Sequence, residues 1–218
     1  HVNPHHVKKS KELDDNNPNK NDRKDPKTIA ALVNEGRFSY PYIPTGIYAE
    51  IRSLSNLRFQ TQEELTRIKN RIARWFSIYF PEYKNVYGDL KAISGRMVLK
   101  AAPLPEDIVK LGVEGVNQIW RNAKLRGAGM KRAKTLVSAA EHSIGSKEAP
   151  EAARIELENL LNDMDVYASR LEELLRNIEE KLKEIPYIDK LMAIKGIGLV
   201  TVSGFIAEVG DIGRFDNP

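Results

Sequence analysis

The chain has 218 residues, of which 41% are hydrophobic, so it can fill a real core in one large domain or two small ones. Charged residues make up 29% with a net charge of +4, a basic balance that permits nucleic-acid binding without requiring it. The absence of cysteine excludes disulfides and thiolate metal sites and favours the cytoplasm, and neither a signal peptide nor an apolar run of the roughly 20 residues that cross a bilayer is visible.

The two ends of the sequence suggest a piece of a longer protein. The chain begins at His1 instead of methionine, and its first residues have the pattern of a strand end followed by a helix. It stops at Pro218, directly after a predicted helix end where a domain normally continues. We therefore expect both ends to be artificial.

Residues 1–40 are polar, with a turn-rich centre and a short apolar helix that stops at Gly36. Asp22 and Asp25 stand three residues apart where this helix begins, so both carboxylates can face the same side. Paired carboxylates suit a hard divalent cation such as Mg²⁺, which prefers oxygen ligands and keeps several waters. The alternative is structural, because Asp25 before Pro26 is also a good helix N-cap with proline in the first helical position.

Residues 41–80 open with a linker that contains two prolines and a glycine, and they continue as a long amphipathic helix. Apolar residues keep a spacing of three and four from Ile47 to Tyr79, which predicts eight or nine turns with an interruption around residues 58–61. We interpret this segment as the first helix of a coiled-coil arm.

Residues 81–147 predict a small region of short helices separated by glycine and proline. The run from Arg121 to Lys134 carries six lysines and arginines and no acid. A solvated helix face is the ordinary interpretation of such a run, whereas a polyanion such as nucleic acid is the functional one. The candidate nucleic-acid-binding residues of this run are Arg126, Lys131 and Arg132.

Residues 148–186 predict a second long helix with a continuous coiled-coil pattern. Nine apolar residues alternate steps of four and three: Leu157, Leu161, Met164, Ala168, Leu171, Leu175, Ile178, Leu182 and Ile185. The outer face is acidic, with 11 Asp and Glu against 5 Lys and Arg between residues 148 and 184. The apolar stripe can pack on the 41–80 helix folded back antiparallel, or on a second copy of the chain in a homo-oligomer.

Residues 187–218 have the layout of a helix-hairpin-helix: an apolar helix end, Lys195, a Gly-Ile-Gly turn and a second apolar helix. Gly196 permits a positive φ, and Gly198 lets the backbone approach a ligand closely. The amides that open the second helix, near Thr201, then point at an anion such as a phosphate. Such contacts position DNA without reading its sequence. The alternative is a purely structural turn between two helices.

Two stretches resemble the DEDD transposases of insertion sequences, the family numbered one hundred and ten, which includes the Piv invertases. The first (VNPHHVKK, then NKNDRKDPKTIAALV) is similar to the end of that family's catalytic domain, where Asn-Pro follows a strand and Lys-Thr-Asp-x-x-Asp-Ala opens a helix. The second (IKGIGLVTVSGFIAEVGDIGRFDNP) is similar to the start of its C-terminal transposase domain. The resemblance spans nearly all of the chain.

The resemblance implies a catalytic domain with the ribonuclease-H-like fold of the resolvase RuvC, in which Asp, Glu, Asp and Asp hold Mg²⁺. Asp22 and Asp25 correspond to the last two of these acids, and the first two would precede His1. The family also implies a serine nucleophile, here beyond the end of the chain, and a structured guide RNA that pairs with donor and target DNA. Asn21 and Pro26 depart from the family's usual Thr and Ala, which can shift Asp25 relative to Asp22.

Together these patterns predict a mainly α chain: the tail of a RuvC-like α/β domain, long coiled-coil helices, a small helical region and a helix-hairpin-helix. The predicted function is that of a prokaryotic DNA transposase or recombinase, with Mg²⁺-dependent strand cleavage and exchange in the intact protein and nucleic-acid binding alone in this piece. Two alternatives stay open. One is a non-enzymatic DNA-binding or scaffold module, and the other is an oligomerisation protein whose glycines only turn the chain.

Overall fold

The computed structural model describes residues 1–15, 24–88, 90 and 92–215, and these residues form helices and no strand. The helices are α1 (Pro4–Asp15), α2 (Lys24–Asn34), α3 (Gly46–Tyr79), α4 (Tyr83–Tyr87), α5 (Ile93–Ala101), α6 (Pro105–Asn122), α7 (Met130–Glu141), α8 (Pro150–Leu182), α9 (Ile188–Met192) and α10 (Leu199–Val209), with a short 3-10 helix at Ile212–Arg214. The mainly α class predicted from the sequence is confirmed.

The strand end expected at the start of the chain is not observed among the described residues. Asn3 and Pro4 begin α1 instead: the Asn3 side-chain oxygen accepts a hydrogen bond from the His5 amide at 2.9 Å. Asparagine at the N-cap followed by proline in the first helical position is a favourable helix start, because proline has no amide hydrogen to leave unsatisfied. The Asn-Pro pair therefore caps a helix here.

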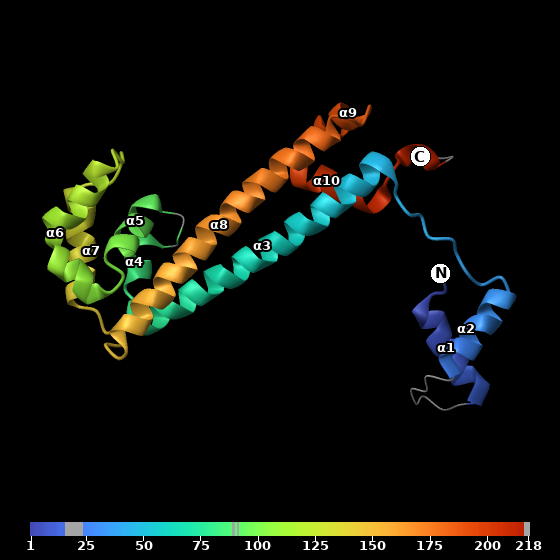
Figure 1. The fold of residues 1–218 in the computed structure, drawn as a ribbon, viewed down its shortest axis with the longest axis horizontal. Coiled ribbons are helices and arrows are strands. Elements are labelled where there is room, and N and C mark those ends of the chain that lie inside the picture. The colour runs from blue at the N-terminus through green and yellow to red at the C-terminus, as the bar shows by residue number, and fades with distance from the viewer. Residues whose placement is uncertain (16–23, 89, 91, 216–218) are drawn as a thin grey trace.

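The long helices α3 and α8 lie side by side and run antiparallel, as Figure 1 shows. At one end the Trp75 indole donates to the Ala153 carbonyl at 3.0 Å, and at the other the hydroxyls of Tyr48 and Tyr187 lie 3.3 Å apart. The expected interruption at residues 58–61 is wrong, because α3 is continuous. The Thr61 hydroxyl donates to the carbonyl one turn earlier at 2.7 Å, so this polar residue is accommodated inside the helix.

The apolar stripe of α8 is buried or half-buried along its length, and α3 of the same chain covers it. Pairing within the chain was one of the two arrangements that the sequence left open. A second copy is therefore not needed to bury this stripe, and a homo-oligomer stays a prediction. Whether the two helices supercoil as in a coiled coil also stays a prediction.

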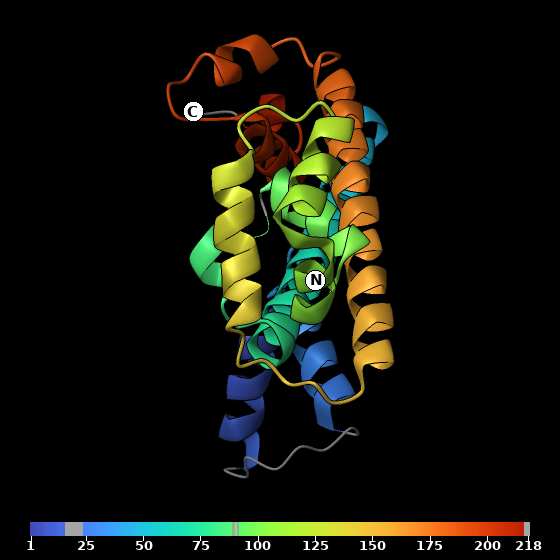
Figure 2. The same ribbon diagram turned by 90° about the vertical axis from the view of Figure 1, so that its left-hand side faces the viewer.

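Two apolar cores lie at the two ends of this helix pair, which we call the arm. The larger core joins the second half of α3 and the first half of α8 to α4–α7, and it buries both tryptophans, Trp75 and Trp120. The smaller core joins the start of α3 and the end of α8 to α9 and α10, through residues such as Ile51, Ile178 and Ile206. Figure 2 shows α6 and α7 side by side at the larger-core end.

The helices α1 and α2 pack on each other and connect to the arm through residues 37–45 (Figure 1). This linker touches the far end of the chain: the Arg214 guanidinium lies 4.3 Å from the centre of the Tyr42 ring. Gly210, with a φ of +72°, lies so close to Tyr42 that any Cβ at that position would clash with the ring. Among the described helices, none is long and apolar enough to cross a membrane.

Candidate nucleic-acid interface

Asp25, the one candidate metal ligand that the structure describes, lies in the first turn of α2 and forms an ion pair with α1. Its carboxylate accepts a hydrogen bond from the Lys11 ammonium at 2.7 Å, and the Lys11 side chain is only 11% exposed. An acid in the first helical turn is favourable beside the positive end of the helix dipole. Asp22 lies outside the described residues. The observed role of Asp25 is therefore to join α2 to α1.

The described residues do not by themselves make a metal site. No group of three or more His, Asp or Glu side chains comes close enough in this part of the chain to hold a metal ion. The carboxylate of Asp25 is already engaged by Lys11, while Mg²⁺ takes an octahedron of oxygen ligands. The described residues thus supply too few free ligands to hold a divalent cation by themselves, and we assign no chemical step of this chain to one.

The basic run predicted from the sequence covers the end of α6, the connecting turn and the first residues of α7, and we call this region the α6–α7 turn. Arg126, Lys131 and Arg132 are all exposed, and none of them has an ion-pair partner among the residues that the structure describes. Gly127 has a φ of +84°, and Gly129 starts α7 without a side-chain cap. The turn therefore presents unpaired cations beside the positive end of a helix dipole.

This turn is concave as well as basic. A hollow of about 530 Å³ lies between it and α4, lined in part by Lys131 and Arg132. The Arg132 guanidinium lies 5.6 Å from the centre of the Tyr87 ring. Burial raises the pKa of the Tyr87 hydroxyl, so this ring stays neutral and adds no negative charge. Cations close to an aromatic face in a hollow suit a phosphate-bearing partner.

The predicted hairpin is present as a short helix, a glycine turn and a longer helix. Gly196 has a φ of +87°, as the sequence predicted, and the half-buried Ile197 packs against the smaller core. Gly198 is extended, with φ −110° and ψ 175°, and open space surrounds the position of a Cβ. Lys195 and Thr201 are exposed. The helix before the turn, α9, has only five residues, so a true helix-hairpin-helix stays a prediction.

The candidate nucleic-acid-binding residues lie in two separate turns and do not form one site. The α6–α7 turn and the α9–α10 turn lie at opposite ends of the arm (Figure 1). A helix of 34 residues, the length of α3, is about 50 Å long. One small ligand cannot touch both turns, whereas an extended nucleic acid can.

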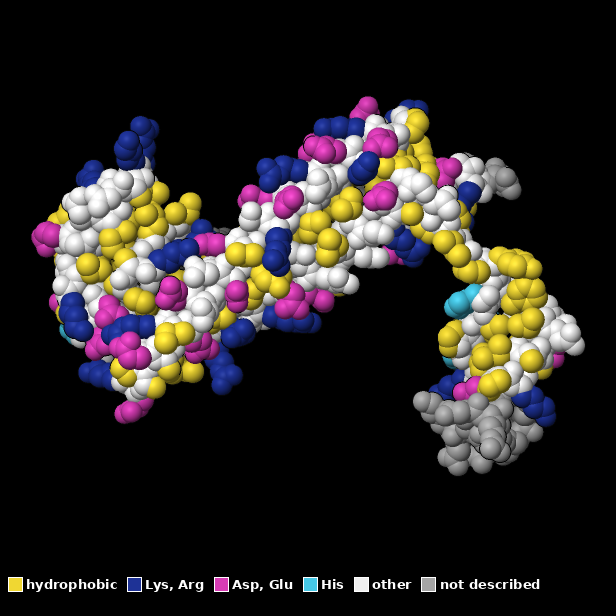
Figure 3. All heavy atoms as spheres, viewed as in Figure 1, with side chains coloured by type: hydrophobic (Ala, Val, Ile, Leu, Met, Phe, Trp, Pro, Cys, Tyr) yellow, Lys and Arg dark blue, Asp and Glu magenta, His cyan; other side chains and the backbone are white. Residues whose placement is uncertain are grey.

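Charge along the arm is mixed. The helix α8, whose outer face is acidic, packs beside α3, whose described cations are Arg52, Arg58, Arg67, Lys69, Arg71 and Arg74. Figure 3 shows Lys and Arg side chains interspersed with Asp and Glu over this part of the surface. The arm therefore neutralises much of its own charge, whereas the α6–α7 turn is a place where cations gather without acids among the described residues.

Part of this chain matches a known protein family. Residues 1–81 match the family model of the DEDD transposases of insertion-sequence family 110, described as a transposase. The matched segment covers α1, α2 and α3, and the resemblance at residues 194–218 lies outside it. The match supports a transposase function in general, within a family of metal-dependent, DNA-recombining enzymes. No curated protein matches the chain.

Proposed function

We propose that the chain is a nucleic-acid-binding part of an insertion-sequence DNA transposase or recombinase, since residues 1–81 match the family model of the DEDD transposases of insertion-sequence family 110. The family match is the observation that carries this proposal. The unpaired cations of the α6–α7 turn support it, because a protein that neutralises phosphates releases the counterions condensed on a nucleic acid. Such an enzyme works where its DNA is, so the proposed location is the cytoplasm of a prokaryotic cell.

Both DNA and a structured guide RNA are proposed as partners. The exposed lysines and arginines would contact phosphates, which DNA and RNA share, so the same surface serves either polymer. At the other end of the arm, Lys195 and the amides that open α10 would add a second phosphate contact. A ligand that follows the arm could reach both ends.

Asp22 and Asp25 are proposed as two carboxylates of a divalent-metal site that needs further ligands. We expect Mn²⁺ to bind this chain only weakly, on the order of millimolar, because Mg²⁺-type sites require several oxygen ligands. Paramagnetic broadening of nuclear magnetic resonance signals by Mn²⁺ measures this. Asp25→Asn should abolish the broadening near α2, and Asp163→Asn on the exposed face of α8 is the control. Equal broadening in both variants would contradict the assignment.

The function itself is tested by binding of the 218-residue chain to labelled duplex DNA, branched DNA and structured RNA across a salt series. We expect binding to at least one of the three, with the logarithm of affinity falling linearly as the logarithm of salt concentration rises. A control variant removes Arg71, Arg74 and Lys147, which are exposed cations elsewhere, and should bind nearly as well as the unchanged chain. Failure to bind any of the three ligands at low salt contradicts the proposed function.

A further inference from the structure

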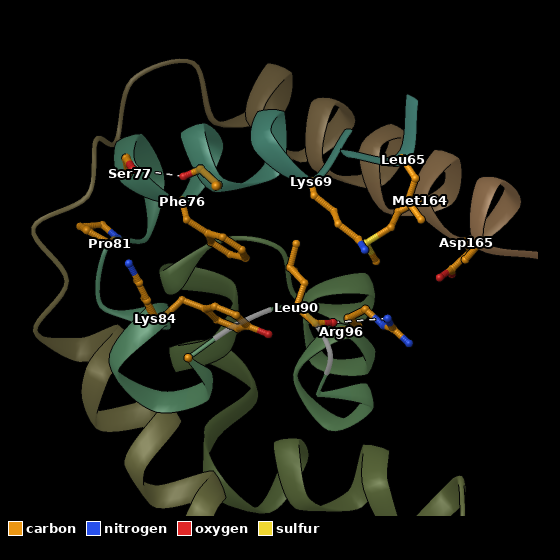
Figure 4. A pocket seen from close by; sticks show the side chains of 14 residues that line it. Leu65, Lys69, Phe76, Ser77, Pro81, Lys84, Leu90, Arg96, Met164 and Asp165 are labelled. Carbon is orange, nitrogen blue, oxygen red and sulfur yellow. Dashed lines mark hydrogen bonds between the residues drawn. The ribbon is translucent and has the colours of Figure 1, made fainter. Parts of the chain in front are cut away.

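A second cleft lies between the arm and the helices α4 and α5, and its lining residues differ from those of the hollow at the α6–α7 turn (Figure 4). Its volume is about 580 Å³, within the range of sites that hold small ligands. Side chains from α3, α4, α5 and α8 line it, so its shape depends on how the larger core positions these helices.

The floor of the cleft is apolar and aromatic. Phe76 and Tyr83 stack with ring centres 4.4 Å apart and planes within 5° of parallel. Leu90 lies beside them, and Figure 4 shows Phe76 and Leu90 directed into the space. Phe76 and Tyr83 are only 9% and 2% exposed, so the floor offers an apolar surface against which a flat group can pack rather than a free ring face.

The rim of the cleft is cationic. Lys69 comes from α3, Lys84 from α4 and Arg96 from α5, on different sides of the opening (Figure 4). Neither lysine has an ion-pair partner among the described residues, and Arg96 donates only to the Leu90 carbonyl, at 3.3 Å. The one acid among the described lining residues, Asp165, is already paired with Lys100 outside the cleft, at 2.5 Å. Among the residues that the structure describes, the rim therefore lacks counter-charge.

We propose that this cleft takes one unpaired base of a nucleic acid, with an adjacent phosphate on Lys69, Lys84 and Arg96; the proposal rests on the proposed function. A purely apolar ligand would leave three cations without partners, and an inorganic anion would leave the aromatic floor uncovered. A nucleotide unit has both a planar ring and an anionic group. Contact of an unpaired base with apolar side chains, together with phosphate contacts to cations, can hold a single-stranded segment.

The proposal predicts selectivity for unpaired bases. In a continuous duplex each base is stacked and paired, so it cannot enter the cleft, whereas a bulged base is already free to do so. The cations at the rim have no means of distinguishing sequences, so the preference should concern the state of the base more than its identity.

The test uses the 218-residue chain and two labelled DNA duplexes that differ only in one bulged 2-aminopurine. We expect the bulged duplex to bind roughly tenfold more tightly, because the apolar cleft removes one base from water, and the 2-aminopurine fluorescence to change on binding. Equal affinities together with unchanged fluorescence would overturn the proposal. Binding of the fully paired duplex in that case would leave the proposed function standing. Binding of neither duplex would overturn this proposal, and it would contradict the proposed function only if branched DNA and structured RNA also failed to bind.

Two variants locate the effect in the cleft. Ala73 is exposed at the edge of the cleft, so Ala73→Phe should fill the space and remove the preference for the bulge without weakening binding to the paired duplex. The double variant Lys69→Ala and Lys84→Ala changes only exposed side chains, so it should fold normally and lower the salt slope for the bulged duplex by about two.

The matched control is Arg71→Ala, an exposed cation of α3 that does not line the cleft and should leave the preference for the bulge intact. A preference that survives both cleft variants would overturn the proposal. An acidic, phenylalanine-containing peptide serves as a competitor. Tighter binding of that peptide than of the bulged duplex, lost in Ala73→Phe, would overturn the proposal in favour of a protein partner.

Discussion

The two ends of the arm carry the two candidate phosphate-binding turns, and they are built differently. The α6–α7 turn rests on the larger core and displays several exposed cations without partners. The α9–α10 turn rests on the smaller core, and within it one lysine, Lys195, accompanies two glycines. One end thus offers charge and the other offers backbone amides. The comparison teaches that a glycine-containing turn alone does not define a binding mode, because its neighbours decide which groups face a phosphate.

Different kinds of contact also hold the helices together at the two ends of the arm. At the larger-core end, Arg154 of α8 pairs with Asp107 of α6 at 2.8 Å, so the start of α8 is tied to α6 by charge. At the smaller-core end, the contacts are aromatic: the Tyr48 and Tyr187 hydroxyls meet, and Arg214 stacks on Tyr42. Burial and the hydrogen bond with Tyr187 raise the pKa of Tyr48, so the Tyr48 hydroxyl stays neutral in the physiological range.

The largest expected effect comes from breaking the arm that both ends share. Leu171 is 9% exposed and belongs to the stripe of α8 that α3 covers. Leu171→Asp should destabilise the chain by several kcal/mol, because it places an unpaired carboxylate against apolar side chains. Urea unfolding followed by circular dichroism measures this. Val166→Asp, at a position 47% exposed on the same helix, should stay within about 0.5 kcal/mol of the unchanged chain. Similar losses in both variants would mean that α8 lacks a buried seam.

The second-largest effect compares the contributions of the two turns to the salt dependence of DNA binding. Removing Arg126, Lys131 and Arg132 together should lower the salt slope of DNA binding by about three, whereas Lys195→Ala should lower it by about one. All four side chains are exposed, so thermal stability should change little. Binding across a salt series gives both slopes. An unchanged slope in Lys195→Ala would make the α9–α10 turn a structural feature only.

The sequence could predict the elements that depend on local pattern. Apolar residues spaced three and four positions apart predicted both long helices. The positive φ of Gly196 was predicted because glycine, which has no Cβ, tolerates this conformation. The break expected near Thr61 was wrong because a buried threonine can bond its own helix backbone, which polarity alone does not reveal. The family resemblance at the N-terminus was confirmed over residues 1–81.

Features that depend on how distant segments meet could not be predicted. Lys11 and Asp25 are 14 residues apart, and only the packing of α1 on α2 brings them to 2.7 Å. The cleft likewise needs side chains from four helices, and Lys69 on its own is one of many cations along α3. Nothing in the spacing of either set signals the contact. The candidate nucleic-acid residues were found by charge and glycine content, and their roles stay predictions.

A smaller effect separates the two glycines of the α9–α10 turn. Gly196→Ala should cost about 1–2 kcal/mol, because its φ of +87° is unfavourable for any residue with a Cβ. Gly198→Val should leave stability nearly unchanged, since its backbone is extended and open space surrounds the Cβ position. If a phosphate sits against the α10 amides, Gly198→Val should nevertheless weaken binding to every DNA and RNA ligand alike. Thermal melting and binding assays on both variants provide the measurement, and full binding by Gly198→Val would argue against a phosphate there.

The smallest expected effect is a loss of stability at low pH, and it should affect the larger-core end of the arm first. Burial acts to raise the pKa of Asp107, but the hydrogen bond from Arg154 and the Leu104 amide outweigh it and hold the pKa below its ordinary value of 3.8. A carboxyl whose pKa is lowered by folding stabilises the folded state above its unfolded pKa, and this contribution disappears as the pH falls through the lower, folded pKa. Stability at this end should therefore decline below about pH 4.

Tryptophan fluorescence can follow this loss selectively, because Trp75 and Trp120 both lie in the larger core and are 1% and 0% exposed. We expect the urea concentration at the midpoint of unfolding, measured by tryptophan fluorescence, to decrease as the pH is lowered from about 6 to about 3. The decrease should be smaller in Asp107→Asn, because this variant has already lost the ion pair at neutral pH. Asp163→Asn, an exposed acid of α8 without an ion-pair partner among the described residues, should show the same pH dependence as the unchanged chain. A pH dependence that is identical in Asp107→Asn would show that charge does not fasten this end, and the contrast with the aromatic end would then rest on core size alone.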